Sequence, residues 1–210
     1  MTLPGVEDSW HRMTNWFGQH ATAVPSILRG PASETDLARA SDAVGVALPA
    51  DLLAWWRLVD GVTEESWMDD PILPSLYHPW SVDGALYSRD QWLQVATDGA
   101  DTARQDGRPA PAEQPAGTPT GYGWAPQWLP IANDCFGSDL FVDLRPGPLH
   151  GCLMEWDHDE GPIREPLWPG VQAMLAEVAD ALESGALMPG LDVRVQADGE
   201  HMQWVGPDCR

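Results

Sequence analysis

The chain contains no lysine, so arginine supplies all eleven of its positively charged side chains. Aspartate and glutamate together number 32, which gives a formal net charge of -21 at pH 7. A surface this negative repels the phosphate backbone, and we therefore expect no nucleic acid among its partners. The same charge would attract a basic protein and speed its association. The plainer alternative is that the charge serves solubility alone.

Cysteine and long apolar runs are also scarce. The three cysteines, at positions 135, 152 and 209, show no CxxC spacing, and their odd number argues against a disulfide framework. Residues 1–19 have neither the basic start nor the apolar run of a secretory signal. No stretch approaches the roughly 20 apolar residues that a membrane span needs. We therefore expect a cytoplasmic protein with no membrane contact.

Common catalytic signatures are missing too. The sequence has no GxSxG, GxxxxGK[ST], GxGxxG or HExxH motif. Cys152 lies in a predicted strand, where a buried, inert thiol is the expected role, and no local motif activates Cys135. We accordingly predict no catalytic residue, no cofactor and no enzymatic activity.

One segment is nevertheless rich in groups that can bind metals. Carboxylates and imidazoles ligate zinc or a harder cation, but the spacing here matches no ligand motif and is typical of a polar turn after a strand. We predict that no metal binds, and we keep a metal-dependent enzyme as the less favoured alternative. The residues concerned lie within 150–160: His150, Glu155, Asp157, His158, Asp159 and Glu160.

Tryptophan is abundant, with twelve residues against three phenylalanines and three tyrosines. Most of these rings should be buried, because an indole is mainly apolar area with a single donor. Two of them, Trp67 and Trp156, are flanked by carboxylates, which suits an anchor for a basic protein surface. The alternative is two solvated loops with partly buried rings. The partner-binding residues that this hypothesis selects are Trp67, Asp69, Asp70, Trp156, Asp157, Asp159 and Glu160.

Apolar spacing and capping residues predict five helices. Ser33 with Asp36 is typical of a helix start, and Gly45 of a helix end. Pro49 suits a first helical turn. The first predicted helix begins at Asp8 or Ser9. The other four run from Ser33 to Gly45, from Pro49 to Gly61, from Ser88 to about Thr102 and from Leu167 to Leu182.

Short alternating runs predict strands in the second half of the chain. They cover residues 127–132, 140–144 and 151–156, and the middle one has the period-two pattern of a half-buried strand. Residues 191–205 are predicted to form a hairpin around the two-residue turn Asp198-Gly199. Residues 104–123 are rich in Pro, Gly and Ala, so we expect a flexible surface insertion there.

Helices, strands, a helix and then a hairpin follow one another in separate blocks, which favours an α+β fold. We expect one domain over residues 1–210, with a mostly antiparallel sheet packed by N-terminal helices and one C-terminal helix. A chain of this length can bury about 70% of its unfolded surface without the help of disulfides or structural metals.

An ordered set of short segments resembles the SUKH superfamily, which includes fungal cell-wall assembly regulators and many bacterial toxin-immunity proteins. The resemblance implies an α+β domain that binds proteins without catalysis or cofactor, so an immunity protein is our leading hypothesis and a regulatory scaffold its rival. The 104–123 segment and the terminal hairpin depart from the pattern. The resemblance covers roughly residues 10–184 and rests on Leu28-Arg29-Gly30-Pro31-Ala32-Ser33, Val44-Gly45, Leu48-Pro49-Ala50-Asp51-Leu52, Asp60-Gly61, Ile131-Ala132-Asn133-Asp134, Gly137, Phe141-Val142-Asp143-Leu144 and Gly151.

Overall fold

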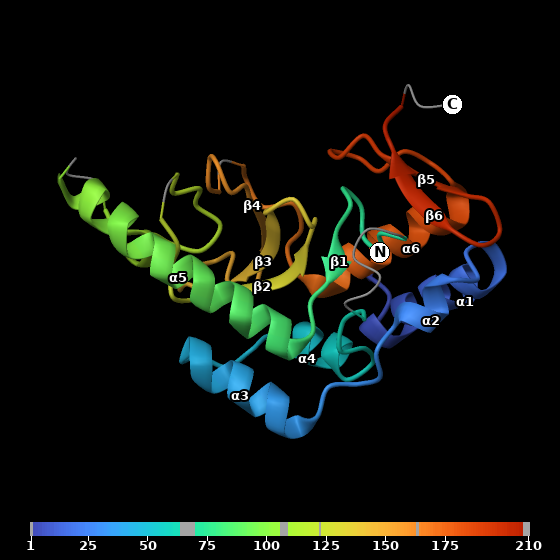
Figure 1. Ribbon diagram of the computed structural model, residues 1–210, viewed down its shortest axis with the longest axis horizontal. Coiled ribbons are helices and arrows are strands. Elements are labelled where there is room, and N and C mark those ends of the chain that lie inside the picture. The colour runs from blue at the N-terminus through green and yellow to red at the C-terminus, as the bar shows by residue number, and fades with distance from the viewer. Residues whose placement is uncertain (1, 64–69, 106–108, 122, 163, 208–210) are drawn as a thin grey trace.

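The computed structural model shows an α+β fold of six helices, a four-stranded antiparallel sheet and a separate two-stranded hairpin (Figure 1). It describes residues 2–63, 70–105, 109–121, 123–162 and 164–207, with the backbone alone over 97–105. The elements are α1 (Val6–His20), α2 (Val24–Ile27), α3 (Glu34–Val44), α4 (Ala50–Trp56), β1 (His78–Pro79), α5 (Val82–Gln105), the 3-10 turn η2 (Pro111–Glu113), β2 (Trp128–Asn133), β3 (Asp139–Asp143), β4 (Leu153–Trp156), α6 (Val171–Ser184), β5 (Arg194–Ala197) and β6 (Met202–Val205).

The four-stranded sheet is buried on both faces. Its strand order is β1-β2-β3-β4, and each pair is antiparallel. Side chains alternate along β3, so Leu140 and Val142 join the main core with α1, α4 and α6. Phe141 points the other way, into a smaller core of four tryptophans. The prediction that β3 is half-buried was therefore wrong, since all five of its residues are buried.

Local capping explains both ends of α3 and the end of α6. The Ser33 hydroxyl accepts a hydrogen bond from the Asp36 N–H at 3.1 Å, and Gly45 ends α3 in the left-handed conformation. Gly185 ends α6 in the same way. The prediction for α5 was wrong at its start: the helix begins at Val82, and Ser88 lies inside it, donating a hydrogen bond to Asp139 at 2.7 Å.

The segment 109–121 packs on the sheet and is not the loose insertion that its composition predicts. Arg145 is fully buried and donates to the carbonyl oxygens of Pro111 at 2.8 Å and Thr118 at 2.9 Å. Asp143 accepts from the Gly117 N–H at 2.8 Å. Gly117 has φ +80, and a Cβ there would lie 2.5 Å from the side chain of Leu149. A buried ion pair thus holds this segment in place.

The terminal hairpin was placed correctly, but its turn is longer than predicted. Ala197 pairs with Met202, so residues 198–201 form a four-residue loop. Trp204 is buried and donates from its indole N–H to the Pro71 carbonyl at 3.1 Å. The hairpin therefore lies beside the loop that leads into β1 (Figure 1). None of the described helices has the length and apolar character needed to cross a membrane.

Candidate interaction surface

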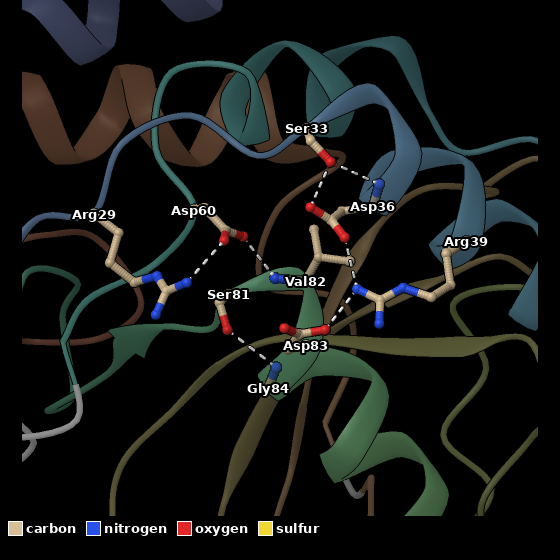
Figure 2. Close-up of polar contacts among 9 residues, drawn as sticks. All are labelled: Arg29, Ser33, Asp36, Arg39, Asp60, Ser81, Val82, Asp83 and Gly84. Atoms are coloured by element: carbon tan, nitrogen blue, oxygen red, sulfur yellow. Dashed lines mark hydrogen bonds and ion pairs between the residues drawn. The ribbon is translucent and has the colours of Figure 1, made fainter.

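Asp60, a residue of the family-like pattern, supports the start of α5. Its Oδ1 accepts a hydrogen bond from the Val82 N–H at 2.8 Å, while its Oδ2 lies 3.4 Å from the Arg29 guanidinium (Figure 2). The Ser81 hydroxyl accepts from the Gly84 N–H at 3.1 Å. Two side chains thus satisfy N–H groups that the first helical turn cannot pair internally. Asp60 is a structural residue whose side chain is only 15% exposed.

Gly61 lets the chain after α4 pass close to the start of α5. It has φ +75, and a Cβ on it would lie 2.4 Å from the Ser81 nitrogen. Only glycine lets the two backbones approach so closely without strain. The Asp60-Gly61 pair therefore joins the chain after α4 to the N-terminus of α5. In the same first turn of α5, Asp83 pairs with Arg39 of α3 (Figure 2).

Other carboxylates of the pattern also accept structural hydrogen bonds or form an ion pair. Asp51 on α4 accepts from the Gln172 N–H at 3.0 Å, in the first turn of α6. Asp143 on β3 is fully buried and pairs with Arg145 at 2.6 Å. Asp134 accepts from the N–H groups of Phe136 and Ser138, at 2.8 and 2.9 Å, and so closes the turn between β2 and β3. These carboxylates hold the fold together.

The predicted partner-binding residues fall in three different environments. Trp67 and Asp69 lie outside the described residues. Asp70 is only 5% exposed and is bonded to the terminal hairpin. Trp156 is also 5% exposed, so it is a core residue and no exposed anchor. Its ring packs against those of Trp92, Trp124 and Trp128 in tilted and edge-on contacts, with centroids 5.1 to 6.0 Å away.

Asp159 and Glu160 are exposed in the loop after β4, and Asp157 of the same loop is partly exposed. Asp157 Oδ1 accepts from the N–H groups of Asp159 and Glu160, at 2.8 and 3.0 Å, and fixes the loop's shape. This loop meets the β2–β3 turn, because a Cβ on Gly137 would lie 3.3 Å from the His158 ring. We call the surface of these two turns the acidic patch: Asp134, Phe136, Asp157, His158, Asp159 and Glu160.

Phe136 supplies the exposed ring that sequence reasoning assigned to Trp156. Its side chain is 63% exposed, on a turn that the Asp134 carboxylate closes. Cys135 and Gly137 on either side both have positive φ, 63 and 104. A ring held out on a fixed turn loses little freedom on binding. The signal in the sequence was Asn133-Asp134 before Cys135-Phe136-Gly137, a turn pattern with an apolar residue inside it.

The groups with metal-binding chemistry come together only in part. Asp157, His158 and Asp159 bring their ligand atoms within 4.8 Å of one another. His150 lies elsewhere, with its Nδ1 3.1 Å from the Arg145 carbonyl oxygen. Glu155 accepts from the Tyr77 hydroxyl at 2.9 Å. The carboxylate of Asp159 is 80% exposed, and an open acidic turn of this kind is not in itself a metal centre.

The thiol of Cys152 has the buried, inert character expected of it. The side chain is fully buried beneath the tryptophan cluster. Burial, followed by the nearby Asp143 carboxylate, raises the pKa of Cys152 to about 12. A thiol in this state is a poor nucleophile, because the thiolate is the reactive form.

Comparison with known families shows which family the chain belongs to. The model of the SMI1 / KNR4 family (SUKH-1) matches residues 31–177. The chain belongs to this family. The match includes the structural carboxylates of Asp51, Asp60 and Asp143 and the turn-closing carboxylate of Asp134, and it ends before the terminal hairpin. No curated protein matches the chain.

Proposed function

We propose that this SUKH family member is a non-catalytic binding domain that neutralises a cognate bacterial toxin by direct contact, as an immunity protein. Family membership supports protein binding in general. The observation that carries the proposal is the acidic patch, which joins four carboxylates to one exposed ring on two fixed turns. It offers a basic toxin domain both charge and an apolar anchor.

The two kinds of side chain have different tasks. The carboxylates, together with the net charge of -21, raise the association rate with a basic partner. Screening weakens this attraction, because the Debye length is about 8 Å at physiological ionic strength. The Phe136 ring acts after contact, when its burial slows dissociation. Trp67 and Asp69, which lie outside the described residues, remain part of the proposal as a second contact.

The test begins with the partner captured from the native cell and identified by mass spectrometry. Surface plasmon resonance then compares Phe136→Ala with Tyr87→Ala, a matched control because Tyr87 is 65% exposed on α5. We expect Phe136→Ala to speed dissociation about tenfold or more, as for a hot-spot ring, and Tyr87→Ala to have little effect. Equal effects of the two variants would contradict the role of the patch.

Charge is tested with Asp157→Asn, Asp159→Asn and Glu160→Gln combined. The matched control carries Glu7→Gln, Asp42→Asn and Asp192→Asn, which remove three exposed carboxylates elsewhere. The first triple variant should slow association more than the control and flatten its dependence on salt. An acidic partner, or association that is indifferent to salt, would refute the electrostatic account.

An activity assay separates immunity from a scaffold role. The captured partner is expressed alone and with this chain, and survival of the cells is counted. Rescue by the wild-type chain and not by Phe136→Ala supports immunity. A partner that is harmless when expressed alone favours the regulatory scaffold instead.

A further inference from the structure

A cleft of about 450 Å³ separates the terminal hairpin from the loop before β1. One wall is Asp70 and Leu76, and the other comes from the two strands of the hairpin and the loop between them. The hairpin wall lies beyond the residues that the family model matches, whereas Asp70 and Leu76 lie within them. The hairpin residues that line it are Gln196, Ala197, Asp198, His201, Met202 and Gln203.

Among the described residues, the partners of the buried Asp70 carboxylate carry no permanent positive charge. Its Oδ1 accepts from the Met202 N–H at 2.7 Å, and its Oδ2 lies 2.9 Å from the Nδ1 of His201. The side chain of Asp70 is 3% exposed, whereas that of His201 is 52% exposed. Asp143, by contrast, is paired with the permanent charge of a fully buried arginine. A buried carboxylate without such a counter-ion is costly, and a permanent cation would lower that cost.

A second carboxylate faces the same space. Asp198 accepts from the N–H groups of Glu200 and His201, at 2.9 and 2.8 Å, both through its Oδ1. These bonds lower the pKa of Asp198, so it stays ionised. Gln196 and Gln203 lie side by side across the strands and add amide oxygens to the lining. The cleft thus presents two negative charges, amide acceptors and one exposed leucine.

We propose that this cleft receives an arginine side chain of a protein partner, with the guanidinium between Asp70 and Asp198 and its methylene stem against Leu76. Charge complementarity selects the occupant, since a planar guanidinium with five donors suits several carboxylate and amide oxygens better than an ammonium does. The inference rests on the proposed function only in naming a basic protein as the source of the side chain.

Protonated His201 competes with that arginine. The groups that face it are Asp70, Glu200 and Asp198, and the first of these raises the pKa of His201 above its ordinary value of 6.5. Below that pKa the imidazolium supplies a positive charge to Asp70. Above it the ring is neutral, and the cleft keeps both of its negative charges for the incoming guanidinium. Arginine binding is therefore expected to strengthen as the pH rises through the titration of His201.

The test uses N-acetyl-arginine amide as the probe and heteronuclear NMR of the full chain as the readout. N-acetyl-citrulline amide, which has the same shape without the charge, is the matched ligand. We expect the arginine probe to shift the amide signals of Asp198, His201 and Met202 and the side-chain amides of Gln196 and Gln203. The citrulline probe should shift none of these.

Variants then assign the binding to the cleft. Asp198→Asn keeps the oxygen that accepts the turn's hydrogen bonds and loses the charge. It should lower the affinity for the arginine probe about fivefold, which is the upper range for a surface ion pair. Asp192→Asn makes the same charge change at an exposed residue that does not line the cleft, and should change the affinity less. Equal effects of the two variants, or equal binding of citrulline, would overturn the proposal. So would an affinity that falls as the pH rises.

The outcome is separate from that of the toxin experiment. If the probe binds and the captured partner proves harmless, the cleft stands and the immunity proposal fails. If the probe fails to bind while Phe136→Ala releases the partner, the acidic patch stands and the cleft is wrong.

Discussion

The chain uses its carboxylates in two opposite ways. Asp51, Asp60 and Asp143 belong to the short segments that resemble the family, and their oxygens bind the N–H groups of helix starts and one buried arginine. Asp159 and Glu160 lie in the loop after β4 and face water. The difference teaches that an acidic residue in a family pattern need not mark a binding site. Here the acidic residues of the pattern stabilise helix starts and form a buried ion pair, whereas the exposed turns are available to contact a partner.

The largest expected loss of stability comes from removing Arg145, the partner of the buried Asp143 carboxylate. In Arg145→Met, the Asp143 carboxylate stays buried without its cation, and the carbonyl oxygens of Pro111 and Thr118 lose their donor. Breaking a buried pair from one side typically costs about 3–5 kcal/mol. Urea denaturation should show a fall of this size in the free energy of unfolding.

Arg29→Met is the control for that variant. Arg29 pairs with Asp60 at 3.4 Å, but its side chain is 45% exposed, so its loss should cost less than about 1 kcal/mol. Limited proteolysis should also cut within residues 109–121 sooner in Arg145→Met. If both arginine variants lose equal stability, the buried pair of Arg145 with Asp143 is no more stabilising than the exposed pair of Arg29 with Asp60.

A smaller effect is expected at Asp60. Asp60→Ala removes the acceptor of the Val82 N–H, and the loss of a helix cap costs about 1–2 kcal/mol. Asp60→Asn keeps an oxygen in that place and should recover most of the loss. Thermal unfolding followed by circular dichroism measures both variants. An asparagine variant as unstable as the alanine one would mean that the ion pair with Arg29 matters more than the cap.

The contrast also shows which features the sequence could reveal. The ends of α3 were predictable because Ser33 and Gly45 act on the backbone within their own turns. The start of α5 was missed because Asp60, 22 residues earlier in the chain, supplies part of its cap. Ser81 was a local signal, but Gly84 stands where a capping box would have an acidic residue or glutamine.

The exposure of the predicted binding residues could be predicted only in part. Clustered carboxylates beside an exposed ring were expected, and Asp159 and Glu160 are exposed, whereas Asp157 is partly exposed. Trp156 was misplaced because its burial depends on Trp92 and Trp124, which lie far from it in the sequence and meet it only in the fold. The packing of residues 109–121 was missed for a similar reason, since composition cannot show that a distant arginine will bind their carbonyl groups.

The smallest effect on stability is expected at the outward carboxylates. Combining Asp157→Asn, Asp159→Asn and Glu160→Gln should change the free energy of unfolding by no more than about 0.5 kcal/mol, as is usual at exposed positions. The asparagine at 157 keeps the oxygen that accepts from residues 159 and 160, so the loop should retain its shape.

The sign of that small change carries information. Neutralising three neighbouring like charges in a chain of net charge -21 relieves repulsion, so the variant should be equal to the wild type or slightly more stable at low salt. Raising the salt concentration should remove the gain, because screening acts on the same repulsion. Urea denaturation at two salt concentrations makes the measurement. A loss as large as that of Asp60→Ala would mean that these carboxylates also hold the fold, and the distinction between inward and outward sets would fail.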